Sequence, residues 1–124
     1  MPTPVPLAGG HNIRVNKGAT LSFGAIRKNY KKQLLPMVGY TARMQVRPDP
    51  RTTSDTTLIL ELTTENGGLT IDEQAATVWI YATDEQTADL PTGKFVYSLE
   101  LIYPTGEVER LIDGYFTVDF ETTV

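Results

Sequence analysis

The sequence predicts an all-β protein, an antiparallel sandwich of about seven or eight short strands with one helical turn. Two observations carry this prediction. Apolar and polar residues alternate with period two from residue 19 onward, which is the pattern of strands with one face in a core. Turns rich in glycine, proline and asparagine separate the alternating segments at roughly the 8–12-residue spacing of a sandwich.

The composition suits one domain and lacks most residues from which catalytic and metal sites are built. The chain has 124 residues, 40% of them hydrophobic and 21% charged. It has no cysteine, which excludes disulfides and thiolate metal sites, and its single histidine, His11, is a poor basis for a Ser-His-Asp relay. No apolar run approaches the roughly 20 residues that cross a bilayer. We therefore expect no enzyme activity, no metal, no cofactor and no membrane contact.

Residues 1–12 are predicted to form an extended arm, rich in proline and glycine, ahead of a single β-sandwich domain at 13–124. The run Pro4-Val5-Pro6 favours an extended path without internal hydrogen bonds. A terminus of this composition becomes ordered when another surface holds it. We expect that surface to belong to a neighbouring subunit, with Val5 and Leu7 as contact residues.

The first alternating segments lie at 19–26, 38–47 and 55–62. The segment at 38–47 has one apolar face and one polar, basic face that carries Arg43 and Arg47. The prolines that follow end it, because proline cannot donate a hydrogen bond to a strand ladder. The residues predicted to face the core from these three segments are Leu21, Phe23, Ala25, Val38, Tyr40, Ala42, Met44, Val46, Leu58, Leu60 and Leu62.

The segment at 77–82 is apolar on both faces, since Val78 and Ile80 alternate with Trp79 and Tyr81. This predicts a central strand whose second face is covered by the helical turn, the arm or another subunit. The remaining strands are predicted at 69–71, 94–103, 107–113 and 115–120. From the last three, the inward residues are Phe95, Tyr97, Leu99, Leu101, Tyr103, Phe116, Val118 and Phe120.

Turn residues join these strands. The stretch 65–68, Glu-Asn-Gly-Gly, predicts a hairpin loop, and 104–106, Pro-Thr-Gly, predicts a tight connection between two strands. The pair at 113–114, Asp-Gly, is either a turn or a bulge inside one long strand. The helical turn is expected at 84–90, with Asp84 as its N-cap and proline ending it.

Paired carboxylates are the main candidates for catalysis, because glycosidases use two of them. They fall in predicted turns, caps and solvent-facing positions, where acidic residues are expected in any soluble domain, so we predict no catalytic role for them. The pairs are Asp72 with Glu73, Asp84 with Glu85, Glu107 with Glu109, and Asp119 with Glu121.

Charge is divided unevenly along the chain. Residues 1–51 hold nine basic residues and one acidic residue, whereas residues 52–124 hold two basic and fourteen acidic. Such a division indicates a charged partner or self-association if the two parts face opposite ways, and nothing unusual if strands from both parts mix in space. The basic cluster at 27–32 includes Tyr30, a composition that suits nucleic acid. The excess of acids would repel a phosphate backbone, so we do not expect a nucleic-acid partner.

Three stretches resemble small β-sandwich structural proteins of tailed phages, found in baseplate upper proteins and in collar proteins that attach long tail fibres. They are GYTARMQVRPDPRT at 39–52, LILELTTENGGLTID at 58–72 and DEQTADLPTGKFVYSLELIYPTGEVERLIDGYFTV at 84–118. The shared features are a Gly-Tyr-Thr-Ala strand, an Asn-Gly-Gly hairpin, a short helix, a Leu-Pro-x-Gly-x-Phe/Tyr-x-Tyr-x-Leu hairpin and a second glycine before the last strand. Those proteins often carry an acidic strand before the Gly-Tyr-Thr-Ala motif, where this chain has the basic residues 28–32.

The resemblance implies an immunoglobulin-like sandwich that forms a homo-oligomeric ring around the phage tail and attaches tail fibres or baseplate components. The chain would then reside in the virion, in its tail, after assembly in the cytoplasm of the host bacterium. Its partners would be further copies of itself and other tail proteins. We expect the interface to use basic and aromatic residues, namely Val5, Leu7, Arg27, Lys28, Tyr30, Lys31, Lys32, Arg43, Arg47, Trp79, Tyr81 and Tyr115.

Two other functions remain open at this point. One is a structural role on the head side of the virion, as a capsid decoration or head–tail joining protein. The other is a carbohydrate-binding or hydrolytic module, which would need an aromatic platform beside acidic residues in one loop.

Overall fold

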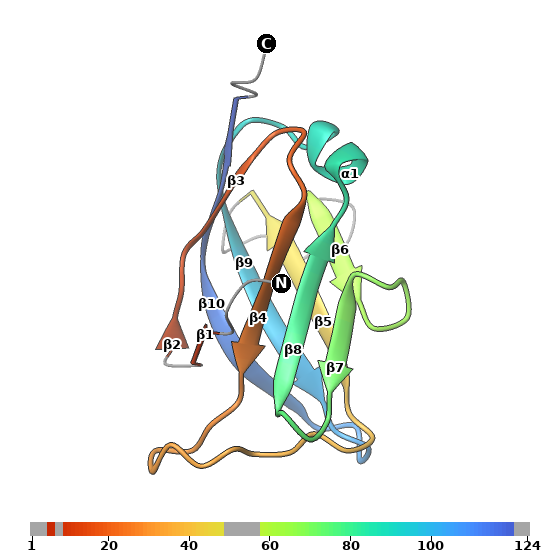
Figure 1. Ribbon diagram of the computed structural model, residues 1–124. Helices are drawn as coiled ribbons and strands as arrows, with labels where there is room; N and C mark the ends of the chain where they lie inside the picture. Colours follow the sequence, from red (N-terminus) through yellow and green to blue (C-terminus); the bar gives the residue numbers. More distant parts are fainter. Residues whose placement is uncertain (1–4, 7–8, 49–57, 121–124) are drawn as a thin grey trace.

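Two β-sheets pack face to face (Figure 1). The structure, a computed structural model, describes residues 5–6, 9–48 and 58–120. One sheet has the strand order β1-β4-β8-β7, and the other has the order β2-β10-β9-β5-β6, with β3 also paired to β10. The strands are β1 (Val5–Pro6), β2 (Gly9–Gly10), β3 (Ile13–Asn16), β4 (Leu21–Ile26), β5 (Thr41–Arg47), β6 (Leu60–Thr63), β7 (Leu69–Asp72), β8 (Thr77–Ala82), β9 (Gly93–Ile102) and β10 (Val108–Asp119).

This strand order is that of an immunoglobulin fold. Strands β4, β8 and β7 correspond to strands B, E and D of one immunoglobulin sheet, and β10, β9, β5 and β6 to G, F, C and C′ of the other. The N-terminal strand is divided, since β1 pairs with β4 of the first sheet and β2 and β3 pair with β10 of the second. The predicted fold class is confirmed.

The core lies between the sheets and follows the predicted alternation in most strands. The largest side chains with almost no exposed surface are Met37, Met44, Val46, Leu62, Leu69, Val78, Ile80, Leu99, Leu101, Ile112, Phe116 and Val118. Strand β8 lies between β4 and β7, so its prediction as a central strand is confirmed.

Two residues predicted to face the core are exposed instead, Val38 at 67% and Phe120 at 73%. Strand β5 begins only at Thr41, after a turn in which the Tyr40 amide donates to the Met37 carbonyl. That turn places Met37, rather than Val38, in the core. Phe120 follows Asp119, the last residue of β10, and so lies outside the paired part of the strand.

The stretch 65–68 forms a turn but not a hairpin. It connects β6 of one sheet to β7 of the other, which corrects the prediction. Asn66 organises the turn as its composition suggests, because its Oδ1 accepts from the amides of Thr63 and Gly68. The hydrogen bonds of Asn66 are therefore those expected of a turn with this composition. The packing of the two sheets decides that β7 joins the sheet opposite to that of β6.

The pair 113–114 lies inside one continuous strand, β10, and the register shifts between Arg110 and Ile112. The tight connection at 104–106 is confirmed, since Tyr103 donates its amide to the Glu107 carbonyl.

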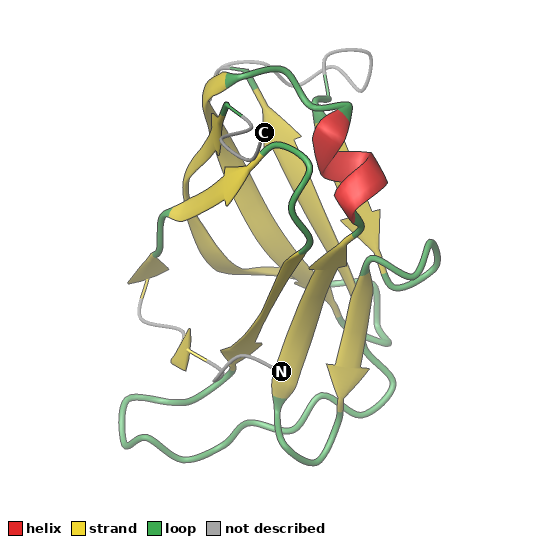
Figure 2. Cartoon of the chain, turned by 45° about the horizontal axis from the view of Figure 1, so that its top comes forward, coloured by secondary structure: helices red, strands yellow, loops and turns green. Residues whose placement is uncertain are grey.

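Helix α1 (Asp84–Ala88) lies at one end of the sandwich (Figure 2). Its N-cap is Thr83, one residue before the predicted Asp84, because Thr83 and Gln86 form a reciprocal capping box. Thr87 fastens the helix to the turn between β3 and β4, accepting from the Gly18 amide and donating to the Ala19 carbonyl. In the described part of the chain, no helix is both long and apolar enough to span a membrane.

Candidate interaction surfaces

The connection between β4 and β5 projects from one end of the sandwich (Figure 1). Residues 28–34 fold back on themselves, with Lys28 and Leu34 bridged at the base, and we call this segment the finger. Asn29 holds its turn, since Asn29 Oδ1 accepts from the amides of Lys31 and Gln33. Tyr30 is 89% exposed, and Lys31 and Lys32 are exposed beside it. The connection that contains the finger joins strands of different sheets. Three of the predicted interface residues, Tyr30, Lys31 and Lys32, are exposed on it.

Arg27 lies at the base of the finger and points inward. Its side chain is only 11% exposed and forms a two-pronged ion pair with Glu109 of β10, with Nη2–Oε1 at 2.8 Å and Nε–Oε2 at 3.2 Å. Its Nη2 also donates to the Tyr103 hydroxyl at 3.1 Å, and the Tyr103 hydroxyl donates to Glu109. Tyr40 and Tyr103 pack together, with the guanidinium close to both rings. The prediction of Arg27 as an exposed interface residue is therefore corrected: it anchors the finger to the domain.

These contacts shift the protonation equilibria of the three groups. Hydrogen bonds from Arg27 hold the pKa of Glu109 below its ordinary value, against the opposing effect of burial. Hydrogen bonding to Glu109 raises the pKa of Arg27 and that of Tyr103. All three shifts favour an ionised carboxylate, a charged guanidinium and a neutral phenol at neutral pH. The cluster is therefore a stable ion pair and not a poised acid or base.

Replacing Arg27 with glutamine is expected to lower the free energy of unfolding at neutral pH by about 1–3 kcal/mol, since Glu109 loses its charged partner while partly buried. The matched control is Arg110→Gln. Its ion pair with Asp113 spans 3.6 Å between side chains 57% and 51% exposed, so the expected change is within about 0.5 kcal/mol.

The stabilisation from Glu109 should depend on pH in a defined direction. Because folding lowers the pKa of Glu109, this stabilisation is present above the ordinary value of 4.5 and disappears as pH falls through the lower folded value. Denaturant unfolding at a series of pH values should show the difference between wild type and Arg27→Gln shrinking in acid. A difference that stayed constant from neutral pH to about pH 2 would contradict the assignment.

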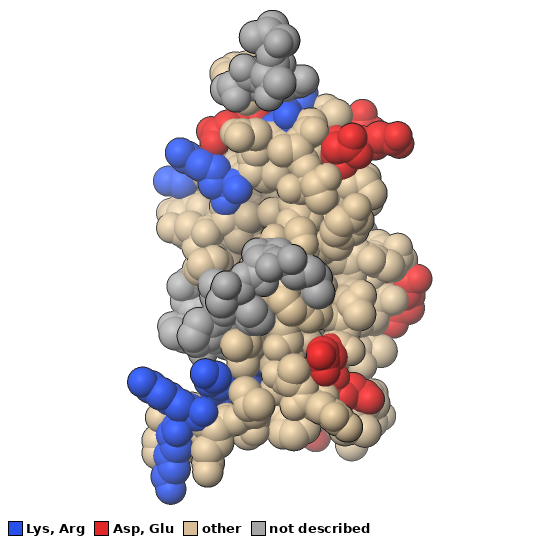
Figure 3. All heavy atoms as spheres, viewed as in Figure 1, with Lys and Arg blue, Asp and Glu red and all other residues tan. Residues whose placement is uncertain are grey.

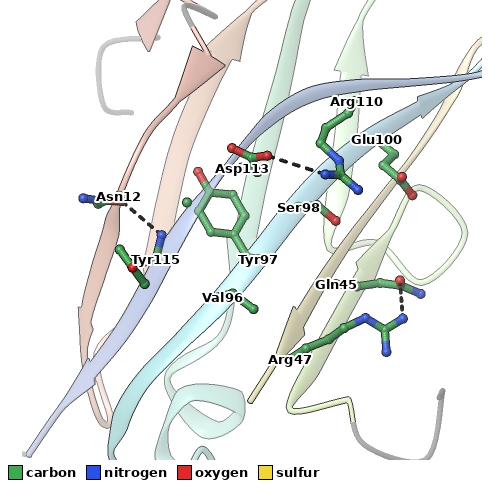
Figure 4. A pocket seen from close by; sticks show the side chains of 11 residues that line it. Asn12, Gln45, Arg47, Val96, Tyr97, Ser98, Glu100, Arg110, Asp113 and Tyr115 are labelled. Carbon is green, nitrogen blue, oxygen red and sulfur yellow. Dashed lines mark hydrogen bonds and ion pairs between the residues drawn. The ribbon is translucent and has the colours of Figure 1, made fainter. Parts of the chain in front are cut away.

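The outer face of the larger sheet is polar and hollowed (Figure 4). An open depression of about 630 Å³ lies over β5, β9 and β10. Arg43 forms a 2.8 Å ion pair with Glu100 across the sheet, and Arg47 donates to Gln45. On the predicted basic face of β5, Arg43 is therefore paired with an acid of the neighbouring strand β9, whereas Arg47 bonds to the neutral Gln45 of its own strand. The depression offers hydrogen-bonding groups rather than excess charge.

The three predicted aromatic interface residues other than Tyr30 lie on two strands, β8 and β10. Trp79 is half-buried against Gly24 of β4, where a Cβ atom would stand 2.7 Å from its ring. Tyr81 is exposed on the same strand as Trp79. Tyr115 is exposed on β10, with the Lys94 ammonium 4.0 Å from its ring centroid. One face of that ring is therefore occupied, which does not favour it as a sugar-stacking platform.

The described part of the arm pairs with its own domain. Val5 pairs in parallel register with Ala25 of β4, and Gly9 and Gly10 pair with β10. Leu7 lies outside the described residues. The expectation that a neighbouring subunit holds the arm is therefore corrected for these backbone segments, because edge strands of the same chain do so.

Glu121, one member of the fourth acid pair, lies outside the described residues, and the members of the other three pairs lie in β7, α1, β10 and the adjoining turns. Glu109 is held by Arg27, and Asp84 and Glu85 lie in the first turn of α1. Within the described ranges, no three His, Asp or Glu side chains are grouped so that they could hold a metal ion.

Exposed charge is separated in space. In the view of Figure 3, most visible Lys and Arg side chains lie on the left side of the molecule and most visible Asp and Glu side chains on the right. The finger projects on the left, whereas α1 and β7 lie on the right (Figure 1). The exposed acids on those right-hand elements and their adjoining loops are Glu65, Asp72, Glu73, Asp84 and Glu85. Both arrangements left open by the sequence occur. Arg14, Arg27 and Arg43 form ion pairs with acids of the second part of the chain, whereas on the face seen in Figure 3 most of the remaining basic and acidic side chains lie on opposite sides.

Comparisons with known proteins add little to this description. No protein-family model and no curated protein sequence matches the chain. Among solved structures, CopC from Methylosinus trichosporium OB3b is similar at 12% identity and a TM-score of 0.41, covering 94% of this chain and 90% of CopC. Extracellular domains 3–5 of Drosophila OTK are similar at 12% identity and a TM-score of 0.37, covering 90% of this chain and 33% of that one. Likenesses of this strength carry no inference about function.

Proposed function

We propose that the chain is a non-enzymatic structural protein of a tailed-phage virion. In this proposal its copies form a ring around the tail, at the collar or baseplate, and attach tail fibres or other baseplate components. The protein is assembled in the cytoplasm of the host bacterium and carried in the tail of the particle. Its partners are further copies of itself and neighbouring tail proteins.

The observation that carries the proposal is that, on the face seen in Figure 3, most basic side chains lie on one side of the domain and most acidic side chains on the other. A ring requires a heterologous contact, in which one surface of each copy meets a different surface of the next. A basic side and an acidic side meet this requirement, and they disfavour contacts between like surfaces. The resemblance of residues 19–120 to phage collar and baseplate domains supports the location.

The purified chain is expected to form a closed oligomer of defined stoichiometry in about 0.1 M salt, where charges interact over about 10 Å. Raising the salt to about 1 M shortens that range to about 3 Å and should shift the protein toward monomers. Native mass spectrometry and light scattering measure both states. A protein that stays monomeric in low salt would contradict the ring.

The position in the particle is a separate test. Particles purified from cells that produce the phage and the chain should contain the protein, and immunogold labelling should place it at the tail. Labelling of the capsid or of the head–tail junction would favour the head-side role instead. Absence of the chain from purified particles would contradict the proposal.

A further inference from the structure

We infer that the finger of one copy docks on the turn between β7 and β8 of the next copy. Tyr30 is the central anchor, and Lys28, Lys31 and Lys32 face Asp72 and Glu73 of the neighbour. This inference rests on the proposed ring and names the two surfaces that build it.

The finger has the composition of an interface anchor. Tyr30 is 89% exposed, which is unusual for a large aromatic side chain in a domain with a well-formed core. Leu34 and Val38 of the same connection are exposed as well, at 47% and 67%. An exposed tyrosine with a lysine ammonium 5.6 Å from its ring centre matches interfaces in which an aromatic residue supplies affinity and charges supply orientation.

The finger is also organised before any partner binds. Asn29 closes its tip by accepting two backbone hydrogen bonds and donating to Gln33 Oε1 at 2.9 Å. At the base, Arg27 Nη1 reaches the carbonyl oxygens of Leu35 and Pro36, each at 3.4 Å, while the same guanidinium pairs with Glu109. An exposed loop held in this way loses little conformational entropy on docking. This ordering has no evident use in the isolated domain, because Tyr30 covers no core residue.

The turn between β7 and β8, which we call the acidic turn, is opposite in charge to the finger and lies at the same end of the sandwich. Asp72 ends β7, Glu73 follows it, and both are exposed. Glu73 Oε2 accepts from the Gly39 amide at 2.8 Å, which fixes the direction of its carboxylate. The connection from β4 runs under the sandwich from the finger on the left to β5 near the end of β7 (Figure 1). Finger and acidic turn therefore lie at the same end of the domain, on opposite sides.

The positions of the finger and the β7–β8 turn favour a second copy of the chain as the partner that docks on the finger. A copy set beside the first, with its long axis parallel, brings its acidic turn level with the finger. Repeating the step leaves each copy with one finger engaged and one turn engaged, as a heterologous ring requires. A nucleic acid would use the lysines but would leave the acidic side facing nothing.

The test uses charge exchange between full-length variants. One variant carries Lys28→Glu, Lys31→Glu and Lys32→Glu, and a second carries Asp72→Lys and Glu73→Lys. Each alone presents like charges across the contact, and its self-association is expected to weaken by more than about tenfold. In an equal mixture, each contact between unlike copies brings opposite charges together, so hetero-oligomers that contain both masses should form and be detected by native mass spectrometry.

Two further variants separate the contact from general charge effects. Glu61→Lys with Asp89→Lys changes the net charge as much as the reversed turn, from exposed positions outside the β7–β8 turn. It is expected to weaken association less than about threefold. Tyr30→Ser should weaken association at least about tenfold. In about 1 M salt, where the protein is expected to be monomeric, its unfolding midpoint should stay unchanged, because the side chain lies outside the core.

The outcomes distinguish this inference from the ring itself. Wild-type protein that stays monomeric contradicts the ring and the inference with it. Wild-type assembly that persists unchanged in the reversed finger overturns the inference and leaves the ring standing. If both charge-reversed variants lose self-association and their mixture forms no hetero-oligomers, the pairing of these two surfaces is overturned. Binding of a DNA oligonucleotide through the finger, by a protein that does not self-associate, would assign the finger to nucleic acid.

Discussion

Leu99→Ala is expected to lower the free energy of unfolding by about 2–5 kcal/mol. Leu99 is fully buried near the middle of β9, and it pairs with Met44 of β5 on one side and Ile112 of β10 on the other. Truncation removes apolar contacts and leaves a cavity between two sheets whose strands are held in place by their hydrogen-bonded neighbours. Denaturant unfolding followed by circular dichroism measures the loss.

The matched control for this substitution is Val108→Ala. Val108 is also aliphatic and belongs to the same sheet, but it is 52% exposed at the start of β10. Its truncation should change the free energy of unfolding by less than about 0.5 kcal/mol. Equal effects at the two positions would mean that the facing of β9 has been assigned wrongly.

Gly114→Ala is expected to lower the free energy of unfolding by about 2–4 kcal/mol for a different reason. A Cβ atom at this position would stand 2.5 Å from the carbonyl oxygen of His11, which is backbone and cannot move aside alone. That carbonyl accepts from the buried Tyr97 hydroxyl, and the His11 amide donates to the Asp113 carbonyl at 2.8 Å. The added methyl group forces the N-terminal segment off β10.

A double-mutant cycle with deletion of residues 1–12 isolates this contact. Without His11, the methyl group at position 114 has no backbone to meet, so Gly114→Ala should cost much less in the shortened chain than in the full one. Far-ultraviolet circular dichroism establishes that the shortened chain folds, and denaturant unfolding supplies the four free energies of the cycle. An equal cost in both chains would show that the penalty arises within β10 and not from the crossing segment.

The contact between His11 and Gly114 could not be predicted from the composition of the arm. Proline and glycine in residues 1–12 indicate an extended path but contain no information about the edge that receives it. The edges that receive it belong to β4, where Val5 pairs with Ala25, and to β10, where Gly9 pairs with Ile112 near the other end of the chain. The small size of Gly114 was a usable signal, and it was interpreted only as a turn or a bulge.

The sequence predicts which residues of the finger are exposed, but not which basic residues are paired with acids. The exposed finger was expected from its run of basic residues, and Lys31, Lys32 and Tyr30 are exposed there. Arg27 belongs to the same run, yet it is buried against Glu109, a residue 82 positions later that was considered only as half of an acid pair. Likewise, Arg43 seemed part of a free basic face until β9 placed Glu100 beside it.

What the sequence determined by itself was the set of strands and the faces they bury, because alternation and turn chemistry act between residues close in the chain. Strand β8 (Thr77–Ala82) matches its predicted bounds, and Tyr97, Leu99 and Leu101 face the core as expected. The tertiary structure alone decided which sheet each strand joins, where the arm lies and which charges remain free. These depend on contacts between residues far apart in the chain, such as Arg27 with Glu109 and His11 with Gly114, and no local pattern specifies such contacts.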